Sequence, residues 1–246
     1  DAYAMAAASV DEALRNAVCV GVDLELIAGL DNFCWPDPVE SSKTPDGRYK
    51  LAQLVRANRA IDDTCRAYRL PCISGKDSMK NDATLNGEKI SVPPTILFSL
   101  VGNHPDVRKA VSSDFKTPGD AIYLLGETHQ ELGASELAFM LSDEGSGGIG
   151  GAVPEIDTSR NLAMYRALTT AMGESLVRSA HDCSDGGLAT ALAECCFGSD
   201  SGADLDVAPL WGDCETMDKW GALFGESLGR ILVSIRQSDR DAFEQS

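Results

Sequence analysis

The chain has 246 residues, 43% of them hydrophobic, which is enough to fill the core of one large domain or two smaller ones. Acidic residues outnumber basic ones by 38 to 21, and the net charge of -17 argues against nucleic acid as a partner. No stretch approaches the roughly 20 apolar residues of a membrane-spanning helix, and the first residues lack the basic start of an export signal, so we expect a cytoplasmic protein without a membrane partner.

Apolar residues at helical spacing predict two helices in the first third of the chain, over residues 3–20 and 47–68. The polar and aromatic residues 32–36 between them are expected to form a loop. Further on, the Asn86-Gly87 pair is typical of a tight hairpin turn, so we expect a strand on either side of it.

Two apolar runs in the middle of the chain, residues 95–101 and 121–125, lack polar alternation and predict strands buried on both faces. The glycine-rich residues 142–154 are expected to form a boundary or a lid. The last third predicts helices over residues 160–172 and 188–196 and strands over residues 176–179, 203–207 and 231–235. This alternation predicts an α/β or α+β fold in two parts.

Three familiar motifs match in part but lack the surroundings that they require. Residues 225–229 fit the GxSxG pattern of a hydrolase nucleophile, but all three histidines precede them, whereas that fold places its histidine later. Residues 145–150 fit GxGxxG without the strand before and the helix after that a dinucleotide site has. Residues 75–76 resemble the end of a P-loop, yet Leu70 and Asp77 replace its first glycine and its hydroxyl residue.

The first candidate site is the polar segment that follows residue 74. Gly75 permits close backbone approach, Lys76 offers a cation for phosphate, Asp77 is a hard oxygen ligand for Mg²⁺, and Ser78 adds a hydroxyl group. The same residues also suit a solvated turn whose charges point outward. Spacing alone leaves both interpretations open.

The second candidate site lies where a predicted strand meets a predicted helix. The backbone N–H groups of Gly186 and Gly187 could receive an anion at the positive end of that helix, and Asp182 and Asp185 could hold a metal ion. Ser184 or Asp185 could equally be a simple helix cap. His181 proves little by itself, because a single histidine beside a strand is more often a hydrogen-bonded core residue than a catalyst.

The eight cysteines are expected to be reduced and mostly buried, because the chain is long and contains neither CxxC nor an export signal. His181 with Cys183, Cys195 and Cys196 lacks the paired spacing of a structural zinc site, so we expect no zinc. Without an initiator Met, and with its end just after a strand-like segment, the sequence is expected to be a fragment of a longer protein.

Six blocks of the sequence carry a resemblance to a known family. They are residues 5–16, 30–35, 73–79, 93–95, 181–188 and 224–227. In this order they resemble the second half of the phosphoribosylformylglycinamidine synthases, ligases of purine biosynthesis in the aminoimidazole ribonucleotide synthetase superfamily. The resemblance implies a PurM-like half with an N-terminal, barrel-forming α/β domain over residues 1–118 and a C-terminal α/β domain over residues 119–246, truncated at both ends.

The resemblance also implies an activity for the whole enzyme. Members use ATP and Mg²⁺ to activate the formyl amide oxygen of formylglycinamide ribonucleotide, so that ammonia from a glutaminase subunit or domain can displace phosphate. The catalytic histidine of this family belongs to the first PurM-like half, so no catalytic residue is expected in this chain. We therefore expect it to need that half as a partner and to be inactive alone.

Residue roles follow from the resemblance as expectations. ATP would contact Asp31, Gly75, Lys76 and Ser78, and Ser78 would also contact the ribonucleotide substrate. Lys76 replaces an asparagine that binds Mg²⁺ in shorter members, which makes Asp77 the expected metal ligand. In the second segment the resemblance implies a metal role for Asp182 and a phosphate-binding or structural role for the residues His181, Asp185, Gly186 and Gly187.

Two other interpretations remain open. This half could be a non-catalytic site that holds a nucleotide without turnover and stabilises the interface with the first half. The chain could also come from another PurM-like ATP-dependent enzyme, such as a thiamine-monophosphate kinase. A homodimer of this chain is possible in either case, because barrel-forming strands would otherwise expose an apolar edge.

Overall fold

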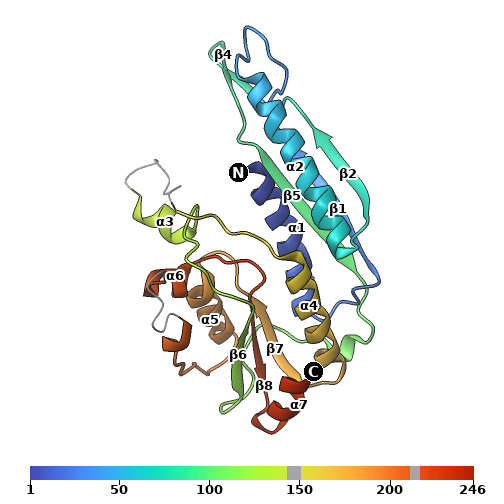
Figure 1. The fold of residues 1–246 in the computed structure, drawn as a ribbon, viewed down its shortest axis with the longest axis vertical. Coiled ribbons are helices and arrows are strands. Elements are labelled where there is room, and N and C mark those ends of the chain that lie inside the picture. The colour runs from blue at the N-terminus through green and yellow to red at the C-terminus, as the bar shows by residue number, and fades with distance from the viewer. Residues whose placement is uncertain (143–150, 211–216) are drawn as a thin grey trace.

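The computed structural model describes residues 1–142, 151–210 and 217–246, and Figure 1 shows its fold. The helices are α1 (Ala2–Cys19), α2 (Gly47–Tyr68), α3 (Glu136–Leu141), α4 (Thr158–Gly173), α5 (Gly187–Phe197), α6 (Lys219–Phe224) and α7 (Arg240–Gln245). The strands are β1 (Ile27–Cys34), β2 (Cys72–Ser78), β3 (Ala83–Leu85), β4 (Glu88–Ile90), β5 (Thr95–Gly102), β6 (Ala121–Leu125), β7 (Val177–Asp182) and β8 (Ile231–Ile235).

The first sheet has the strand order β2-β1-β5. Strand β1 pairs in parallel with β2 and antiparallel with β5. A parallel pair needs a long crossover connection, which α2 supplies. Helices α1 and α2 cover one face of this sheet, where Phe33 and Phe98 are buried (Figure 1).

The other face of the first sheet is open. The side chains of Leu97 and Val101 on β5 are 60% and 56% exposed, whereas Ile96 and Phe98, on either side of Leu97, are buried. The predictions of strands over residues 95–101 and 121–125 are confirmed, but their burial on both faces is wrong, since β6 is only partly buried at every position. An apolar run without alternation cannot distinguish a strand covered twice in one chain from a strand whose second cover is a different molecule.

The second sheet has the order β6-β8-β7 and is antiparallel throughout. Its central strand β8 is buried at all five positions, as predicted for residues 231–235. Ile231 and Val233 face a core that includes α1 and α4, and Leu232 faces a smaller core beneath α5. Helices therefore cover both faces of this sheet.

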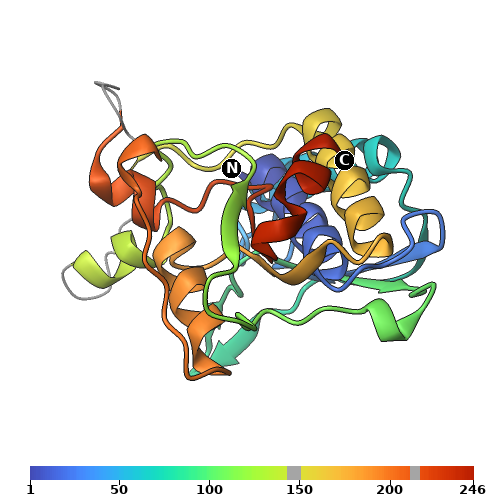
Figure 2. The same ribbon diagram turned by 90° about the horizontal axis from the view of Figure 1, so that it is seen from below.

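The larger core extends across both parts of the chain. It combines buried residues of α1, α2, β1 and β5 with buried residues of α4, β7 and β8. Helix α4 packs against α1 and α2, and α1 also contacts β7, so that the two parts lie side by side in Figures 1 and 2. The border between residues 118 and 119 stays a prediction, but the two parts share one core.

Most predicted elements are confirmed, and three differ. The predicted helices correspond to α1, α2, α4 and α5, and the Asn86-Gly87 hairpin joins β3 to β4 with both residues at positive φ. Residues 32–36 belong in part to strand β1 instead of a loop, and residues 203–207 form no strand. The polar segment after residue 74 is the end of strand β2 and not a turn. No described helix is both long and apolar enough to cross a membrane.

Part of the glycine-rich segment lies outside the described residues. Gly145, Gly147 and Gly150 of the GxGxxG match fall in residues 143–150, so their predicted role as a loop, boundary or lid is untested by the structure.

Candidate functional site

The parallel pairing of β1 and β2 brings together predicted site residues that are far apart in the sequence. Asp31 lies opposite Gly75 in the register, and Phe33 lies opposite Asp77. Because side chains alternate between the faces of a strand, Gly75 and Asp77 belong to the face that α1 and α2 cover. Asp31 of β1 therefore lies on the same face of the first sheet as Gly75 and Asp77 of the edge strand β2.

Lys76 and Ser78 belong to the opposite, open face. They lie opposite Asn32 and Cys34 of β1 in the register. The sequence interpretation placed all four residues from 75 to 78 around one ligand. The strand geometry divides them between two faces, so a ligand that contacts both pairs has to reach around the edge strand β2.

Asp31 and Asp77 form a local concentration of negative charge on the helix-covered face. Burial raises the pKa of Asp31, and the nearby carboxylate of Asp77 raises it further. A divalent cation relieves the repulsion that a nearby like charge imposes on a carboxylate such as Asp31.

The absence of a side chain at Gly75 leaves room for the carboxylate of Asp31. A Cβ atom placed on Gly75 would lie 2.1 Å from Oδ1 of Asp31, so any side chain there would push the carboxylate aside. The glycine that was predicted for close ligand approach thus also allows the close approach of Asp31. The sequence contains no local signal for this contact, because 44 residues separate the two positions.

A groove borders these residues on the helix-covered side. It has a volume of about 620 Å³ and lies between α2 and the start of β2, with Asp31 in its wall. Arg66 and Arg69 also line this groove. Arg66 is paired with Asp62 at 2.7 Å. We call this cavity the α2–β2 groove.

The second predicted segment joins β7 to α5 in the other sheet. Gly186 and Gly187 have φ values of 74° and 65°, and no side chain caps the helix. The N–H of Gly186 donates to the carboxylate of Glu226 at 2.9 Å. One of the donors predicted for an anion is therefore already used by a carboxylate of this chain. Asp185 is not the cap, and its metal role stays a prediction.

His181 and Asp182 are held in a network of their own. Nε2 of His181 lies 2.8 Å from Glu194, and Ser184 donates to Asp182 at 2.5 Å. Hydrogen bonding to Asp182 raises the pKa of His181, although burial opposes this. Burial alone would raise the pKa of Asp182, but hydrogen bonds from His181 and Ser184 and the charge of Arg15 lower it to about 2.

Sequence reasoning missed a buried polar cluster that anchors this segment. Asp11 on α1 is fully buried and accepts hydrogen bonds from Tyr68 at 2.5 Å, from Tyr165 at 2.8 Å and from Asn161 at 3.2 Å. Its other oxygen pairs with Arg15 at 2.5 Å.

Arg15 connects this cluster to the second segment. It donates to Ser184 at 3.1 Å, and its Nε lies 3.8 Å from Asp182. The only sequence signal was an acid and a base four residues apart on the apolar stripe of a helix, Asp11 and Arg15, where a surface pair would be out of place.

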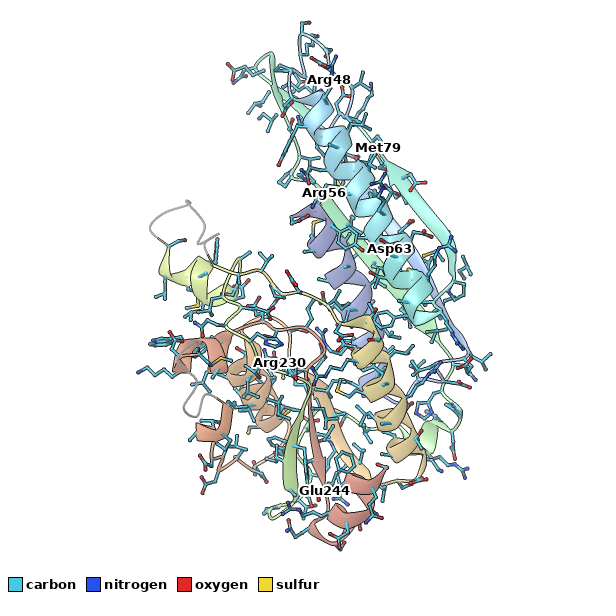
Figure 3. All side chains as sticks on the ribbon, in the orientation of Figure 1. Arg48, Arg56, Asp63, Met79, Arg230 and Glu244 are labelled. Carbon is cyan, nitrogen blue, oxygen red and sulfur yellow. The ribbon has the colours of Figure 1, made fainter. Side chains whose placement is uncertain are left out.

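The GxSxG match is a structural turn. Ser227 is 1% exposed, and its hydroxyl group accepts a hydrogen bond from the backbone N–H of His129 at 2.9 Å. The buried guanidinium of Arg230, labelled in Figure 3 at one end of the second sheet, donates to the carbonyl groups of Gly225 and Ser227. These contacts fix the loop that carries Glu226.

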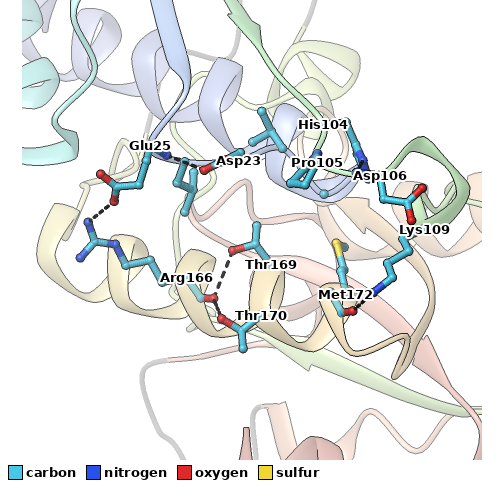
Figure 4. Close-up of a pocket in the computed structure, with 14 residues that line it drawn as sticks. Asp23, Glu25, His104, Pro105, Asp106, Lys109, Arg166, Thr169, Thr170 and Met172 are labelled. Carbon is cyan, nitrogen blue, oxygen red and sulfur yellow. Dashed lines mark hydrogen bonds and ion pairs between the residues drawn. The ribbon is translucent and has the colours of Figure 1, made fainter.

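A further pocket lies between the end of α1 and α4 (Figure 4) and has a volume of about 540 Å³. Its two cationic side chains are already engaged, Arg166 with Glu25 at 3.4 Å and Lys109 with the carbonyl of Gly173. None of the predicted site residues lines it.

The two predicted segments lie in different sheets, so Asp77 and Asp182 cannot be read as one metal site. Within residues 1–142, 151–210 and 217–246, no three His, Cys, Asp or Glu side chains form a group that could hold a metal ion by themselves. A Mg²⁺ ion is often held by one or two carboxylates together with substrate phosphates, and Asp31 with Asp77 fits that requirement.

Comparison with known proteins shows the family from the sequence, and solved structures share the fold. Residues 117–246 match the family described as AIR synthase related protein, C-terminal domain. The chain is 38% identical to the phosphoribosylformylglycinamidine synthase subunit PurL of Anaeromyxobacter sp. (strain Fw109-5). The aligned region covers 96% of this chain and 29% of that relative.

Two solved structures of T. maritima PurL share the fold. The complex with AMPPCP has a TM-score of 0.65 at 18% identity and covers 100% of this chain and 35% of its own. The complex with FGAR has a TM-score of 0.65 at 18% identity and covers 98% of this chain and 36% of its own. This chain therefore spans about a third or less of the proteins that it resembles.

Proposed function

This chain belongs to the family of AIR synthase related proteins, and from that premise we propose that it supplies part of the nucleotide and Mg²⁺ site of a phosphoribosylformylglycinamidine synthase. The whole enzyme would use ATP to activate the formyl amide oxygen of formylglycinamide ribonucleotide, so that ammonia displaces phosphate. The names of the curated relatives and the AMPPCP and FGAR complexes of T. maritima PurL support this proposal.

The register between β1 and β2 carries the proposal. It places Asp31 opposite Gly75 and on the same face as Asp77, and Asp31 also lines the α2–β2 groove. These two carboxylates would hold Mg²⁺, which when bound neutralises charge on the transferring phosphoryl group. Gly75 keeps the space that the carboxylate of Asp31 needs, and Asp31 and Asp77 would supply the oxygen ligands for the ion.

The open face of the first sheet is the surface on which we propose that a partner protein binds. Lys76 and Ser78 share that face with the exposed apolar side chains of Leu97 and Val101. Exposed apolar side chains on the uncovered face of a sheet favour a surface that another protein covers. We propose the first PurM-like half of the same enzyme as that cover, with Ser78 contacting the ribonucleotide from the side where the two halves meet.

The remaining partners and the location are part of the same proposal. A glutaminase subunit or domain would supply the ammonia, and no turnover is expected from this chain by itself. The seven cysteines in the described residues are free thiols, which suits a reducing, cytoplasmic location.

The test uses the full-length enzyme with Asp31→Asn and Asp77→Asn. Each variant should raise the Mg²⁺ concentration for half-maximal synthase activity by roughly tenfold, equivalent to about 1.4 kcal/mol of binding energy. The matched control is Glu88→Gln, which removes one exposed carboxylate from the β3–β4 hairpin and should leave the Mg²⁺ dependence unchanged. Unchanged Mg²⁺ dependence in both aspartate variants, with native folding, would refute the site.

The rate at which bound nucleotide exchanges distinguishes a non-catalytic nucleotide site from a catalytic one. Radiolabelled ATP bound to the full-length enzyme is followed during turnover in the presence of excess unlabelled ATP. Loss of label at the rate of turnover supports a working site. Label that stays bound through many turnovers indicates a structural nucleotide.

A further inference from the structure

Two cysteines face each other where α2 ends and β2 begins. Cys65 lies in the last turn of α2, Cys72 is the first residue of β2, and their sulfur atoms are 3.7 Å apart. The chain reverses between them through Arg69 at a φ of 56°, and the N–H of Leu70 closes the helix end on the carbonyl of Cys65 at 2.9 Å. A helix end and a paired strand thus hold the two sulfur atoms in contact.

One of the two cysteines is accessible from solvent. Cys65 is 8% exposed, Cys72 is exposed, and both line the α2–β2 groove. Cys72 lies opposite Gly29 in the register, on the helix-covered side of the first sheet. A partner that covers the open face of this sheet would therefore leave Cys72 within reach of small molecules.

We propose that Cys65 and Cys72 form a dithiol site that hydrogen peroxide oxidises to an intramolecular disulfide in the folded protein. A disulfide has a sulfur–sulfur distance of about 2.05 Å, so the two sulfur atoms must approach by roughly 1.6 Å. Rotation of the exposed Cys72 side chain can supply this movement. The inference goes beyond the proposed synthase function and does not depend on it.

The reaction proceeds in two balanced steps. The thiolate of Cys72 attacks one peroxide oxygen, the O–O bond breaks, and the products are a sulfenic acid and hydroxide, which takes up the proton that Cys72 released. The sulfur of Cys65 then attacks the sulfur of Cys72, the S–O bond breaks, and water leaves with the proton of Cys65. Two thiols lose two electrons and two protons in total, and one peroxide becomes two waters.

The order of attack follows from the surroundings of each sulfur. Burial raises the pKa of Cys65, and the adjacent Cys72 and the carboxylates of Asp31 and Asp62 raise it further, so Cys65 stays a thiol and acts second. The exposed Cys72 meets the oxidant first.

The charge around the site selects a neutral oxidant. Asp31 and Asp62 lie in the groove with Arg66 and Arg69, and Arg66 is already paired with Asp62. The whole chain carries a net charge of -17, which disfavours anionic disulfides such as oxidised glutathione. Hydrogen peroxide is small and uncharged, and we therefore name it as the oxidant.

Peptide mapping tests the proposal on the complete chain. The folded protein is treated with hydrogen peroxide, free thiols are alkylated, and the product is digested with trypsin. Arg66 and Arg69 lie between the two cysteines, so trypsin separates the peptide of residues 60–66 from that of residues 70–76 unless a disulfide joins them. We expect these two peptides as a linked pair that dithiothreitol separates.

Because the fold holds the two sulfur atoms close together, the disulfide should form faster in the folded than in the unfolded chain. The linked pair should form about tenfold faster in the folded protein than in the same chain unfolded in urea, because the fold holds the sulfur atoms in contact. Equal rates in the two states would refute the structural basis of the site.

Two serine variants complete the test. Cys72→Ser should abolish the linked pair and leave Cys65 open to alkylation after denaturation, whereas Cys34→Ser, at a cysteine elsewhere on the first sheet, should leave the yield unchanged. Because Cys72 is exposed, its serine variant should fold. Sulfinic acid at Cys72 as the main product, or linked peptides that contain Cys34, would overturn the proposal.

Discussion

Replacing Asp11 by Asn is the strongest perturbation that the buried cluster offers. Asn keeps the shape and can still accept hydrogen bonds from Tyr68 and Tyr165, but it leaves Arg15, which is 1% exposed, without its partner at 2.5 Å. Asp182 is the nearest remaining carboxylate, at 3.8 Å. Removing one partner of a buried ion pair costs about 3–5 kcal/mol, so we expect a loss of that order in the free energy of unfolding.

Tyr165→Phe is the matched control. It removes one hydrogen bond to the same carboxylate, that of Asp11 at 2.8 Å, and should cost only about 1 kcal/mol. Urea unfolding followed by circular dichroism measures both variants. With a slope of roughly 3 kcal/mol per molar urea, the midpoint should fall by about 1 M or more for Asp11→Asn and by about 0.3 M for Tyr165→Phe. Equal shifts in the two variants would show that Arg15 does not depend on this charge.

Two further expectations concern the segment between β7 and α5. Gly187→Ala should cost about 1–3 kcal/mol in urea unfolding, because Gly187 has a φ of 65° and its new Cβ would lie 2.4 Å from the carbonyl oxygen of Gly225, whereas Gly173→Ala meets nothing within 4 Å and should be nearly neutral; equal effects would contradict this conformational argument. Asp182, with its pKa lowered from 3.8 to about 2, should contribute about 2 kcal/mol of stability that is complete above pH 4 and lost as the pH falls toward 2. The raised pKa of His181 adds stability that is complete below about pH 6.5 and lost as the pH rises through its folded value. Urea midpoints measured against pH check both signs, and Asp182→Asn should reduce the acid-side loss by about 2 kcal/mol, while other carboxylates of lowered pKa, such as Asp37 and Asp82, keep their share; an unchanged acid-side slope in that variant would refute the assignment.

Helices were predictable where their apolar stripes are regular. The stripes of α1 and α2 gave their bounds to within a residue or two. Strand β1 was missed because Asp31 and Asn32 are polar residues at consecutive positions of a central strand, which reads as a loop. Asp31 and Asn32 are in a strand because β1 pairs with β2 and β5, and pairing between distant segments cannot be predicted from a local sequence pattern.

The residues of the candidate site could be named from the sequence, but their arrangement in space could not. The sequence identified Gly75 and Asp77, yet only the strand register shows that Lys76 and Ser78 belong to the other face. The buried cluster around Asp11 shows the same limit. Its donors come from three helices, so the positions of Asp11 and Arg15 on the apolar stripe of α1 indicate a buried pair but do not identify Tyr68, Asn161 and Tyr165 as its partners.

Helix α1 belongs by sequence to the first part of the chain, yet it lines the core of the second sheet. Val10, Leu14 and Val18 are fully buried in the core that also contains Ile231 and Val233 of β8. A recombinant piece that starts at residue 119 would keep the second sheet and α4 but lose this wall, and its uncovered apolar side chains would favour aggregation. Dissection of the protein into separately expressed pieces should therefore keep α1 together with α4, and the failure of a shorter piece to fold would say nothing about its chemistry.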